Sequence, residues 1–575
     1  MTHLQDLPGI YTEPRQATAI DAIANDYYDK LLELDPTAAT IAGQPGHETE
    51  YFDYSPAGYR AVLDLTRDTL AKVRDAEVVD DVDRVTVDAM NERLGLDIEL
   101  AEAGLVDWEI NNIACPIQDI RAVLDLMPRE TTEQWGHLTG RMANIPGAIE
   151  GWILTLKQAK DQGKVSARRQ VSEAIEQIED FVRDGGFFAT FTQEIIDAAP
   201  ELEEQARLGE TRAIAGYRTL QAFLRDELLP VAPEADAVGP ERYSLYSRKF
   251  LGTTVDLEET YHWGVDELER IIAEQQETAE KIKPGASIDE AKAVLDADPE
   301  RALHGVDALQ EWMQRLSDTA MTEMAEKYFV VGGPMKKLEC CIAPTHDGGI
   351  YYTGPSPDFT RPGRMWWSVP EGDTEFGTWR ETSTVYHEGV PGHHLQIAVA
   401  TALESRLNKW RAHGCWTSGH GEGWALYAER LMQELGFLDD PGNTMGMLNE
   451  QRMRAARVVF DIGLHCGFEI PEQWVERLGL TPGVWTPEAA FEFLKANLTG
   501  SSEFLRHEYL RYLGWPGQAP SYKIGQRVWE QLREQAREAG TAGEHDRDFH
   551  TRALMLGSMG LDTLQRALSI SPKSA

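Results

Sequence analysis

Helical periodicity runs through most of the 575-residue chain and restricts it to a mainly α-helical fold. From Ala17 to about Leu228, apolar residues recur at three- and four-residue spacings that proline and glycine interrupt. The pattern returns at about 257–282 and 300–328, and again from about Thr378 almost to the end. No internal repeat or low-complexity tract accompanies it. We therefore expect helix after helix, with one local β insertion.

That insertion is the segment at about 329–370, which departs from the helical pattern. Short β-branched or aromatic runs such as GGIYYTG and GRMWWSVP are bounded there by glycine and proline, which predicts a small sheet. A second break, LLPVAPEADAVGPERYS at 228–244, is the best candidate for a boundary between lobes. Because the chain is too long for one compact core, we expect an N-terminal helical lobe over 1–235 and a catalytic helical lobe, holding the sheet, over 236–575.

The balance of charge excludes some classes of partner. Asp and Glu number 95 against 55 Lys and Arg, a formal net charge of −40 that repels nucleic-acid phosphates and anionic membrane surfaces. Five scattered cysteines, without a Cys-x-x-Cys pair, indicate neither a disulfide framework nor a thiolate zinc site. The N-terminus lacks a secretory pattern, and no stretch reaches the roughly 18 apolar residues of a membrane span. We therefore expect a cytoplasmic protein that binds neither nucleic acid nor membrane.

The segment 387–394, HEGVPGHH, carries the strongest chemical signal in the chain. A hydrolytic zinc site requires three protein ligands, a free position for water and a nearby carboxylate that accepts the proton of that water. His387 followed by Glu388 is the opening of a His-Glu-x-x-His zinc helix, in which the glutamate is the general base. The second histidine arrives late, as His393 or His394. The alternative is that these histidines only satisfy one another near a helix kink.

A regular helix does not bring these histidines to one metal ion. Residue i+7 returns to the same face but lies roughly 10 Å along the axis. Pro391 removes a backbone donor and Gly392 tolerates unusual dihedral angles, so we expect a bulge over 390–392. Such a bulge brings His393 to the position of the second ligand. The alternative is that His394 binds the metal and His393 supports it from behind.

A third ligand is expected from the segment WTSGHGEGWALYAERLM. Glu422 and Glu429 are seven residues apart, hence on one face of a helix, among apolar side chains. Carboxylates on a buried face need a partner, which a metal supplies. We expect Glu422 to be a ligand and Glu429 to orient a ligating histidine. The alternative is a salt-bridged surface face that uses Arg430, and the nearby His413 and His420 are weaker candidates for a ligand or a substrate contact.

Two later segments carry groups suited to a catalytic cleft. NEQRMRAARVVFDIGLHCGF puts Arg454, Asp461 and His465 on one helix, where they can hold an oxyanion or a substrate carboxylate, or form a buried ion-pair network. HEYLRYLGWPGQAPSYKIG gathers polar tips around a Pro-Gly turn, as in a substrate-binding loop, although a tyrosine-rich helix cap is the alternative. We expect catalytic assistance from His465, Tyr509 and Tyr522, and substrate binding by Arg454, Arg511 and Lys523.

The motifs HEGVPGHHLQ, EGWALYAE, RVVFDIGLH and RYLGWPGQAPSYKIG together resemble the family called domain of unknown function 885, over most of the chain. That family is similar to mainly helical zinc peptidases such as thimet oligopeptidase, neurolysin and carboxypeptidase Taq. In these relatives the zinc helix reads His-Glu-x-Gly-His, and a later helix carries a ligand Glu, in some with a second Glu seven residues on. Matching the patterns leaves two inserted residues at the expected bulge and places Glu422 and Glu429 on the two glutamates.

The resemblance has consequences for the fold and for substrate contacts. It implies a two-lobed helical zinc-peptidase-like fold around a deep channel, with the small β-sheet beside the active site. It also implies an edge strand near 349–352 that pairs with an extended peptide, which makes Tyr351 and Tyr352 candidate substrate-binding residues.

The leading hypothesis is a zinc metallopeptidase of carboxypeptidase or oligopeptidase type that acts on short peptides, because a deep channel excludes folded chains. One Zn²⁺ ion activates a water molecule and Glu388 is the general base; Mn²⁺ or Co²⁺ suits the same ligands. The alternatives are an amidohydrolase of N-acylated amino acids and a non-catalytic peptide-binding protein on the same fold. The substrate sequence, the end that is cleaved and the oligomeric state, a homodimer included, stay open.

Overall fold

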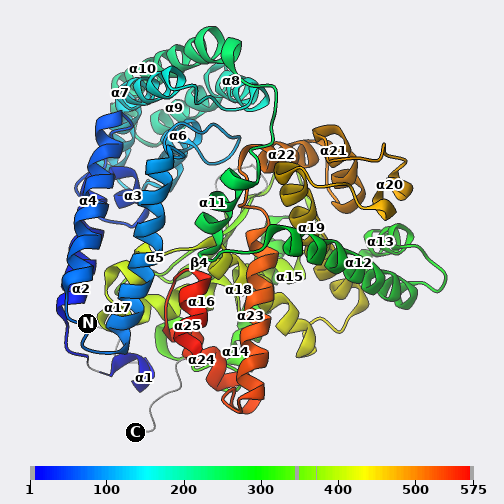
Figure 1. The fold of residues 1–575 in the computed structure, drawn as a ribbon. Helices are drawn as coiled ribbons and strands as arrows, with labels where there is room; N and C mark the ends of the chain where they lie inside the picture. The colour runs from blue at the N-terminus through cyan, green and yellow to red at the C-terminus, as the bar shows by residue number, and fades with distance from the viewer. Residues whose placement is uncertain (1–6, 14, 344–348, 371, 570–575) are drawn as a thin grey trace.

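The computed structural model describes residues 7–13, 15–343, 349–370 and 372–569. Helices hold 69% of the chain, and the strands form two small β-sheets, so the prediction of a mainly α-helical protein is confirmed. Figure 1 shows the N-terminal helices, blue to cyan, along one side and the top of the molecule, with the later helices beside and below them. Within the described ranges, no helix combines the length and apolar character needed to cross a membrane.

Helix ends in the N-terminal half follow polar signals in the sequence. The helical elements here are α1 (Gly9–Thr12), α2 (Ala19–Leu34), α3 (Pro36–Ile41), α4 (Pro56–Asp75), α5 (Asp81–Ala103), α6 (Pro116–Leu126), α7 (Thr132–Asp161), α8 (Arg168–Val182), α9 (Phe187–Ala198), η2 (Pro200–Leu202), α10 (Glu203–Phe223), η3 (Leu224–Leu228), η4 (Leu229–Val231) and α11 (Pro240–Leu251). Thr18 and Asp21 form a reciprocal capping box at the start of α2. Asp80 caps α5, which Gly104 ends in a left-handed conformation at φ 65°.

The second half is equally helical. Its helical elements are α12 (Leu257–Ile282), α13 (Ile288–Asp296), η5 (Pro299–Arg301), α14 (Val306–Met324), η6 (Gly333–Lys336), α15 (Thr378–Glu388), α16 (His393–Ala402), α17 (Glu404–Leu407), η7 (Trp410–Gly414), α18 (Ser418–Glu434), α19 (Pro441–Cys466), α20 (Glu472–Leu478), α21 (Pro487–Asn497), α22 (Ser502–Gly514), α23 (Ser521–Glu538), η8 (Glu544–Asp546), α24 (Arg547–Met555) and α25 (Leu561–Ser569). The long α19 begins where Asp440 accepts the Asn443 N–H and ends at Gly467, whose φ is 70°.

A three-stranded sheet occupies the segment where the sequence predicts one. It consists of β2 (Leu338–Ile342), β3 (Ile350–Thr353) and β4 (Gly363–Trp367), in the order β2-β4-β3. Strand β2 runs parallel to β4, with Leu338 opposite Gly363. Strand β3 runs antiparallel to β4, with Tyr352 opposite Met365. Within the described residues β3 therefore lies at an edge of this sheet.

A second, two-stranded sheet was not expected. Strand β1 (Ala302–His304) pairs antiparallel with β5 (Glu375–Gly377), and Leu303 lies opposite Phe376. The predicted helix over 300–328 is therefore wrong at its start, since α14 begins at Val306. The strand depends on a partner far along the chain, which local periodicity does not reveal.

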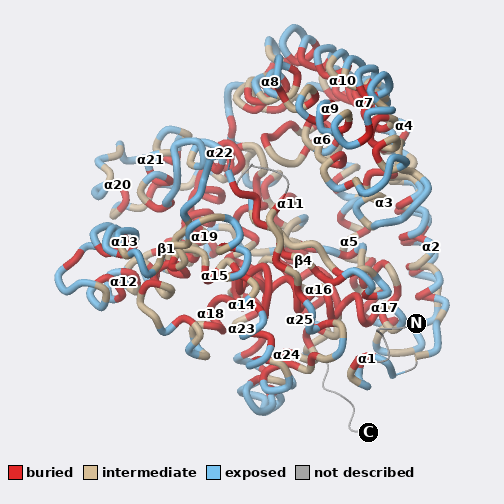
Figure 2. Tube along the Cα trace, turned by 180° about the vertical axis from the view of Figure 1, so that it is seen from behind, coloured by how far each residue is buried: buried red, intermediate tan, exposed pale blue. Residues whose placement is uncertain are grey.

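Buried side chains form two large clusters. The larger joins side chains between Leu7 and Leu94 with others between Tyr243 and Leu564. The smaller runs from Phe52 to Ala232. Helices α2, α4 and α5 thus share a core with the second half of the chain, and the division at residue 235 stays a prediction. In Figure 2 the trace of α16, α18 and β4 is largely buried, near the centre of the molecule.

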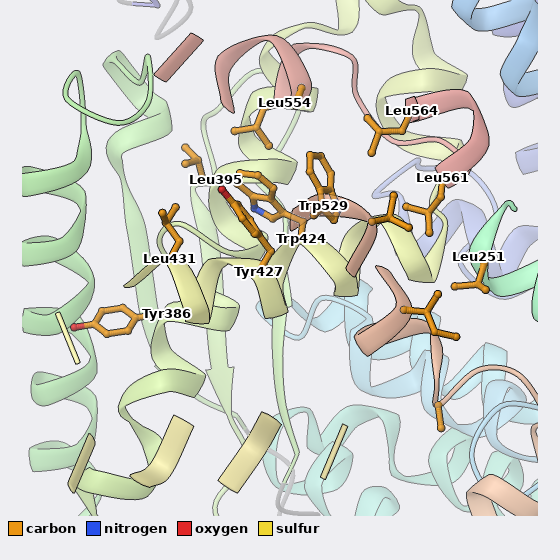
Figure 3. Packing of buried hydrophobic residues seen from close by; sticks show 14 of the residues in the cluster. Leu251, Tyr386, Leu395, Trp424, Tyr427, Leu431, Trp529, Leu554, Leu561 and Leu564 are labelled. Atoms are coloured by element: carbon orange, nitrogen blue, oxygen red, sulfur yellow. The ribbon is translucent and has the colours of Figure 1, made fainter. Parts of the chain in front are cut away.

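Helix α18 is held in place by aromatic packing against α23. The ring centroid of Trp529 on α23 lies 5.0 Å from that of Trp424 and 6.4 Å from that of Tyr427, both on α18 (Figure 3). A Cβ atom added at Gly423 would lie 2.5 Å from the carbonyl carbon of Gly525, so the two backbones approach as closely as glycine allows. This close contact with α23 fixes the position of α18 in the core.

Candidate metal centre

The helical structure is interrupted between α15 and α16, inside the histidine-rich segment. Helix α15 ends at Glu388 and α16 begins at His393, and the peptide bond of Val390–Pro391 between them is cis. The Gly392 N–H donates to the Tyr386 carbonyl oxygen at 3.1 Å, two residues further back than in a regular helix. The expected interruption is confirmed, but it separates two helices and is not a bulge within one.

Three ligand atoms converge across this break. One carboxylate oxygen of Glu422 on α18 lies 3.4 Å from Nε2 of His387 and 3.5 Å from Nε2 of His393. Tetrahedral bonds of about 2.0–2.1 Å place two ligand atoms roughly 3.3–3.4 Å apart, so both distances from the Glu422 oxygen are close to those between ligands of one metal ion. The Glu388 carboxylate joins the two imidazoles in a buried group with ligand atoms within 4.8 Å of one another. The His387–Glu388–His393 group could therefore hold a metal ion.

Electrostatics at this group favour a positive charge between the side chains. Burial alone would raise the pKa of Glu422, but the imidazoles of His393 and His387 outweigh it and hold that pKa well below its usual range. Burial likewise opposes a charge on His387, yet its hydrogen bonds to Glu422 and Glu429 raise its pKa to about 10. The carboxylates thus stabilise a cation here, and a divalent metal ion would replace a proton.

Glu429 orients His387. Its Oε1 accepts the Nδ1–H of His387 at 2.7 Å, which leaves Nε2 as the nitrogen with a lone pair for a metal. Glu429 is 1% exposed and also accepts from Nε2 of Gln451 at 3.4 Å. The Gln451 side-chain oxygen accepts in turn from Nζ of Lys523 at 2.6 Å. A buried chain of hydrogen bonds therefore holds the His387 imidazole on its Nδ1 side.

We expect Glu429→Gln to weaken zinc binding by about 10- to 100-fold, because loss of this partner frees the ring orientation and lowers the basicity of Nε2. Competition with a chromogenic chelator measures the dissociation constant. Glu434→Gln is the matched control, since Glu434 lies on the same helix and pairs with Arg533 instead. Equal zinc affinity in Glu429→Gln and wild type would contradict the orienting role.

Glu388 has the environment of a general base. It is 8% exposed and lies at the end of α15 beside both imidazoles, and its carboxylate has no hydrogen-bond partner among the described residues. Burial raises the pKa of its carboxyl, and the charges on His393 and His387 only partly offset that effect. A carboxylate with a raised pKa accepts a proton more readily near neutral pH.

His394 does not face the metal group. Its Nε2–H donates to the Met335 carbonyl oxygen at 2.9 Å, and its Nδ1 accepts from the Tyr352 hydroxyl at 2.9 Å. Burial lowers its pKa to about 4, so the ring is neutral. Both nitrogens are therefore occupied, and His394 ties α16 to η6 and β3. Of the two alternatives for the second ligand, the geometry favours His393.

The break depends on a residue without a side chain at Gly392. A Cβ atom there would lie 1.8 Å from the His387 carbonyl oxygen, closer than any real contact. We expect Gly392→Ala to lower the free energy of unfolding by about 3 kcal/mol or more and to reduce bound zinc, because the clash moves His387. Thermal unfolding and metal analysis measure both effects. Gly147→Ala is the control, since its Cβ would meet nothing within 4 Å; retained zinc in Gly392→Ala would contradict this account.

The metal group opens into a cavity of about 630 Å³ between α15, α18, α19, α22 and β3. The size suits a short ligand rather than a folded chain. Most of the residues that the sequence predicts for the site line it: Tyr351, Tyr352, His387, Glu388, His393, Glu422, Arg454, Arg511 and Tyr522.

Three predicted site residues lie elsewhere. His465 is buried, its Nε2 hydrogen-bonds the Tyr512 carbonyl oxygen at 2.9 Å, and burial lowers its pKa to about 4. Tyr509 packs its ring against Phe491 and Phe460, outside the cavity. Lys523 forms an ion pair with Glu267 at 2.8 Å and donates to Gln451, on the far side of the hydrogen-bond chain. None of the three faces the metal group, and packing accounts for each.

The weaker histidine candidates also lie outside the cavity. His413 pairs with Glu404 at 2.9 Å, and Nδ1 of His420 contacts the Gln396 side-chain amide at 3.1 Å. Among the charged residues of the cavity, sequence reasoning missed Glu381, Glu450, Arg457 and Glu508. Arg457 was detectable, because it follows Arg454 by three residues and shares its helical face.

Comparison with known proteins identifies the family. Residues 36–568 match the profile described as "Bacterial protein of unknown function (DUF885)". The chain belongs to the DUF885 family. No curated protein matches it.

Two solved structures share the DUF885 chain's fold. The "putative lipoprotein" from Colwellia psychrerythraea has a TM-score of 0.77 and 21% identity, and covers 96% of this chain and 98% of its own. The "putative lipoprotein of unknown function" from Shewanella oneidensis has a TM-score of 0.69 and 16% identity, and covers 96% and 99%.

Proposed function

We propose that this DUF885 protein is a zinc-dependent hydrolase that cleaves peptide bonds in short peptides. The convergence of His387, His393 and Glu422 on one point, with Glu388 beside them, carries the proposal. Two histidines and a glutamate are a common ligand set of catalytic zinc sites, which keep a further position for water. The resemblance to helical zinc peptidases supports the same reading, including two lobes around a substrate channel.

In the proposed hydrolysis, different residues of the chain take different steps. A bound zinc ion supplies a Lewis acid that polarises a carbonyl group and lowers the pKa of a water molecule. Glu388 takes one proton from the attacking water, whose oxygen bonds to the carbonyl carbon. Glu388 then delivers that proton to the leaving nitrogen as the C–N bond breaks. We propose that Tyr522, which lines the cavity, donates its hydroxyl hydrogen to the oxyanion.

Strand β3 offers a second means of positioning substrate. Among the described residues it is an edge strand of the three-stranded sheet, and peptide-binding proteins use such strands to pair with an extended peptide. Tyr351 and Tyr352 of this strand are both among the residues that line the cavity. We propose that the peptide lies along β3 with its scissile carbonyl at the metal group.

A quenched peptide library incubated with zinc-loaded protein tests the function. We expect cleavage that a chelator abolishes and added zinc restores. A panel of N-acylated amino acids tests the alternative amidohydrolase activity of the same centre. Zinc binding without turnover of either panel would favour the peptide-binding alternative and overturn the enzyme proposal.

The cellular location of the protein requires a separate test. The sequence favours the cytoplasm, whereas both structural relatives are described as lipoproteins, which favours the cell envelope. Fractionation of native cells with an antibody to the protein separates the two proposals.

A further inference from the structure

Three arginines form a basic wall in the cavity, defined here as Arg454 and Arg457 on α19 and Arg511 on α22. Their side chains are largely buried, with 14%, 4% and 11% of their areas exposed. Guanidinium groups gathered at this depth repel one another unless anions neutralise them. The wall therefore requires negative partners.

The partners present in the protein are too few. Glu450 pairs with Arg454, and Glu508 is shared between Arg457 at 2.7 Å and Arg511 at 3.1 Å. Two carboxylates thus face three guanidinium groups, which leaves the basic wall with one net positive charge. Of the remaining cavity carboxylates, Glu388 and Glu422 lie at the metal group, and burial raises the pKa of Glu381 to about 7.

Each of the three arginines has one buried nitrogen without an acceptor among the described residues, but only Arg454 has two nitrogens without one. Through Nη1 it pairs with Glu450, and its Nε and Nη2 have no acceptor among the described residues. Nε is buried, whereas Nη2 belongs to a side chain that lines the cavity. A guanidinium group left in this state favours a planar anion that accepts two hydrogen bonds, as a carboxylate does.

The other two arginines are held in place by neighbours. Arg457 donates through Nε to the Tyr512 hydroxyl at 2.6 Å, and Arg511 donates to the Gln518 side-chain oxygen at 2.7 Å. The guanidinium carbons of Arg454 and Arg457 lie 5.9 and 5.0 Å from the ring centroid of Tyr522. Arg457 and Arg511 therefore contribute fixed positive charge, while Arg454 can contact a ligand.

We infer that the basic wall binds the C-terminal carboxylate of the substrate, with Arg454 in contact, so that the protein acts on peptides with a free C-terminus. This inference rests on the proposed function, whose site it extends. Arg454 and Glu388 line the same cavity of about 630 Å³. The carboxylate end and the scissile bond are therefore close together, which favours removal of one or a few C-terminal residues over internal cleavage.

Paired substrates test this inference. We compare kcat/KM for peptides of one sequence with a free or an amidated C-terminus, and expect the free acid to be preferred by about 10- to 100-fold, as for a charge-assisted hydrogen bond. Arg454→Met should bring this ratio close to one, and Arg454→Lys should restore part of it. Arg452→Met is the matched control, since Arg452 lies on the same helix but donates to Asn497 and Gln275 outside the cavity.

A binding measurement separates this inference from the proposed function. Calorimetry with Glu388→Gln protein compares trialanine with its C-terminal amide, without any need for turnover. Tighter binding of the acid, lost when Arg454→Met is added, supports the basic wall even if no peptide is cleaved. Equal binding of acid and amide, or a preference that survives Arg454→Met in a folded protein, would overturn it.

Discussion

Replacing Glu388 with glutamine is expected to lower kcat for peptide cleavage by about 10²- to 10⁴-fold while the protein keeps one zinc ion. The amide has nearly the same shape as the carboxylate but does not accept a proton from water. The Glu388 carboxylate has no hydrogen-bond partner among the described residues, so the change removes no side-chain hydrogen bond from the fold. Single-turnover kinetics with a library peptide that the wild type cleaves measures the rate of cleavage, and metal analysis measures the bound zinc.

The control for this variant is Glu404→Gln. Glu404 lies on the neighbouring α17 and pairs with His413, outside the cavity. It is expected to keep wild-type kcat. If Glu388→Gln kept its activity with zinc bound, another group would be the base, and the proposed role of Glu388 would be wrong.

Replacing His393 with alanine is expected to abolish metal binding and therefore to lower the activity by at least about 10³-fold. Two protein ligands would remain, too few for a stable zinc site. Zinc at 100 times its dissociation constant should add about 2.7 kcal/mol to the free energy of unfolding of the wild type, and none at the same concentration to the variant. Thermal unfolding with and without added zinc measures this difference.

A histidine outside the cavity provides the comparison for His393→Ala. His413→Gln removes an imidazole that lies close to His393 in the sequence. His413 pairs with Glu404 near the surface, outside the cavity. It should retain the full zinc-dependent stabilisation. A His393→Ala protein that zinc stabilises as strongly as wild type would show that the metal binds elsewhere.

The centre of the site was predictable because it depends on local spacing. The pair His387 and Glu388 marks a zinc helix, and the seven-residue step from Glu422 to Glu429 puts both on one face. Pro391 signalled the interruption, although its form as a break between two helices follows from tertiary contacts. Such patterns are predictive because the residues of each pair lie in one helix, and the helix sets their relative positions.

The outer parts of the site were less predictable because burial decides them. His465 and Lys523 occur in segments rich in polar groups, and nothing local shows that one bonds a core carbonyl and the other a buried glutamine. Arg457 and Glu508 reach the cavity only because α19 and α22 meet there. The pairing of β1 with β5 is missed for the same reason, since it joins segments distant in sequence.

Anomalous diffraction at the zinc absorption edge, from a crystal of the zinc-loaded protein, tests the central claim most directly. We expect one strong peak bonded to Nε2 of His387, Nε2 of His393 and a carboxylate oxygen of Glu422, with Glu388 beside it and unbonded. A crystal of fully zinc-loaded protein with no peak at these three side chains, or with its peak at other residues, would contradict the account.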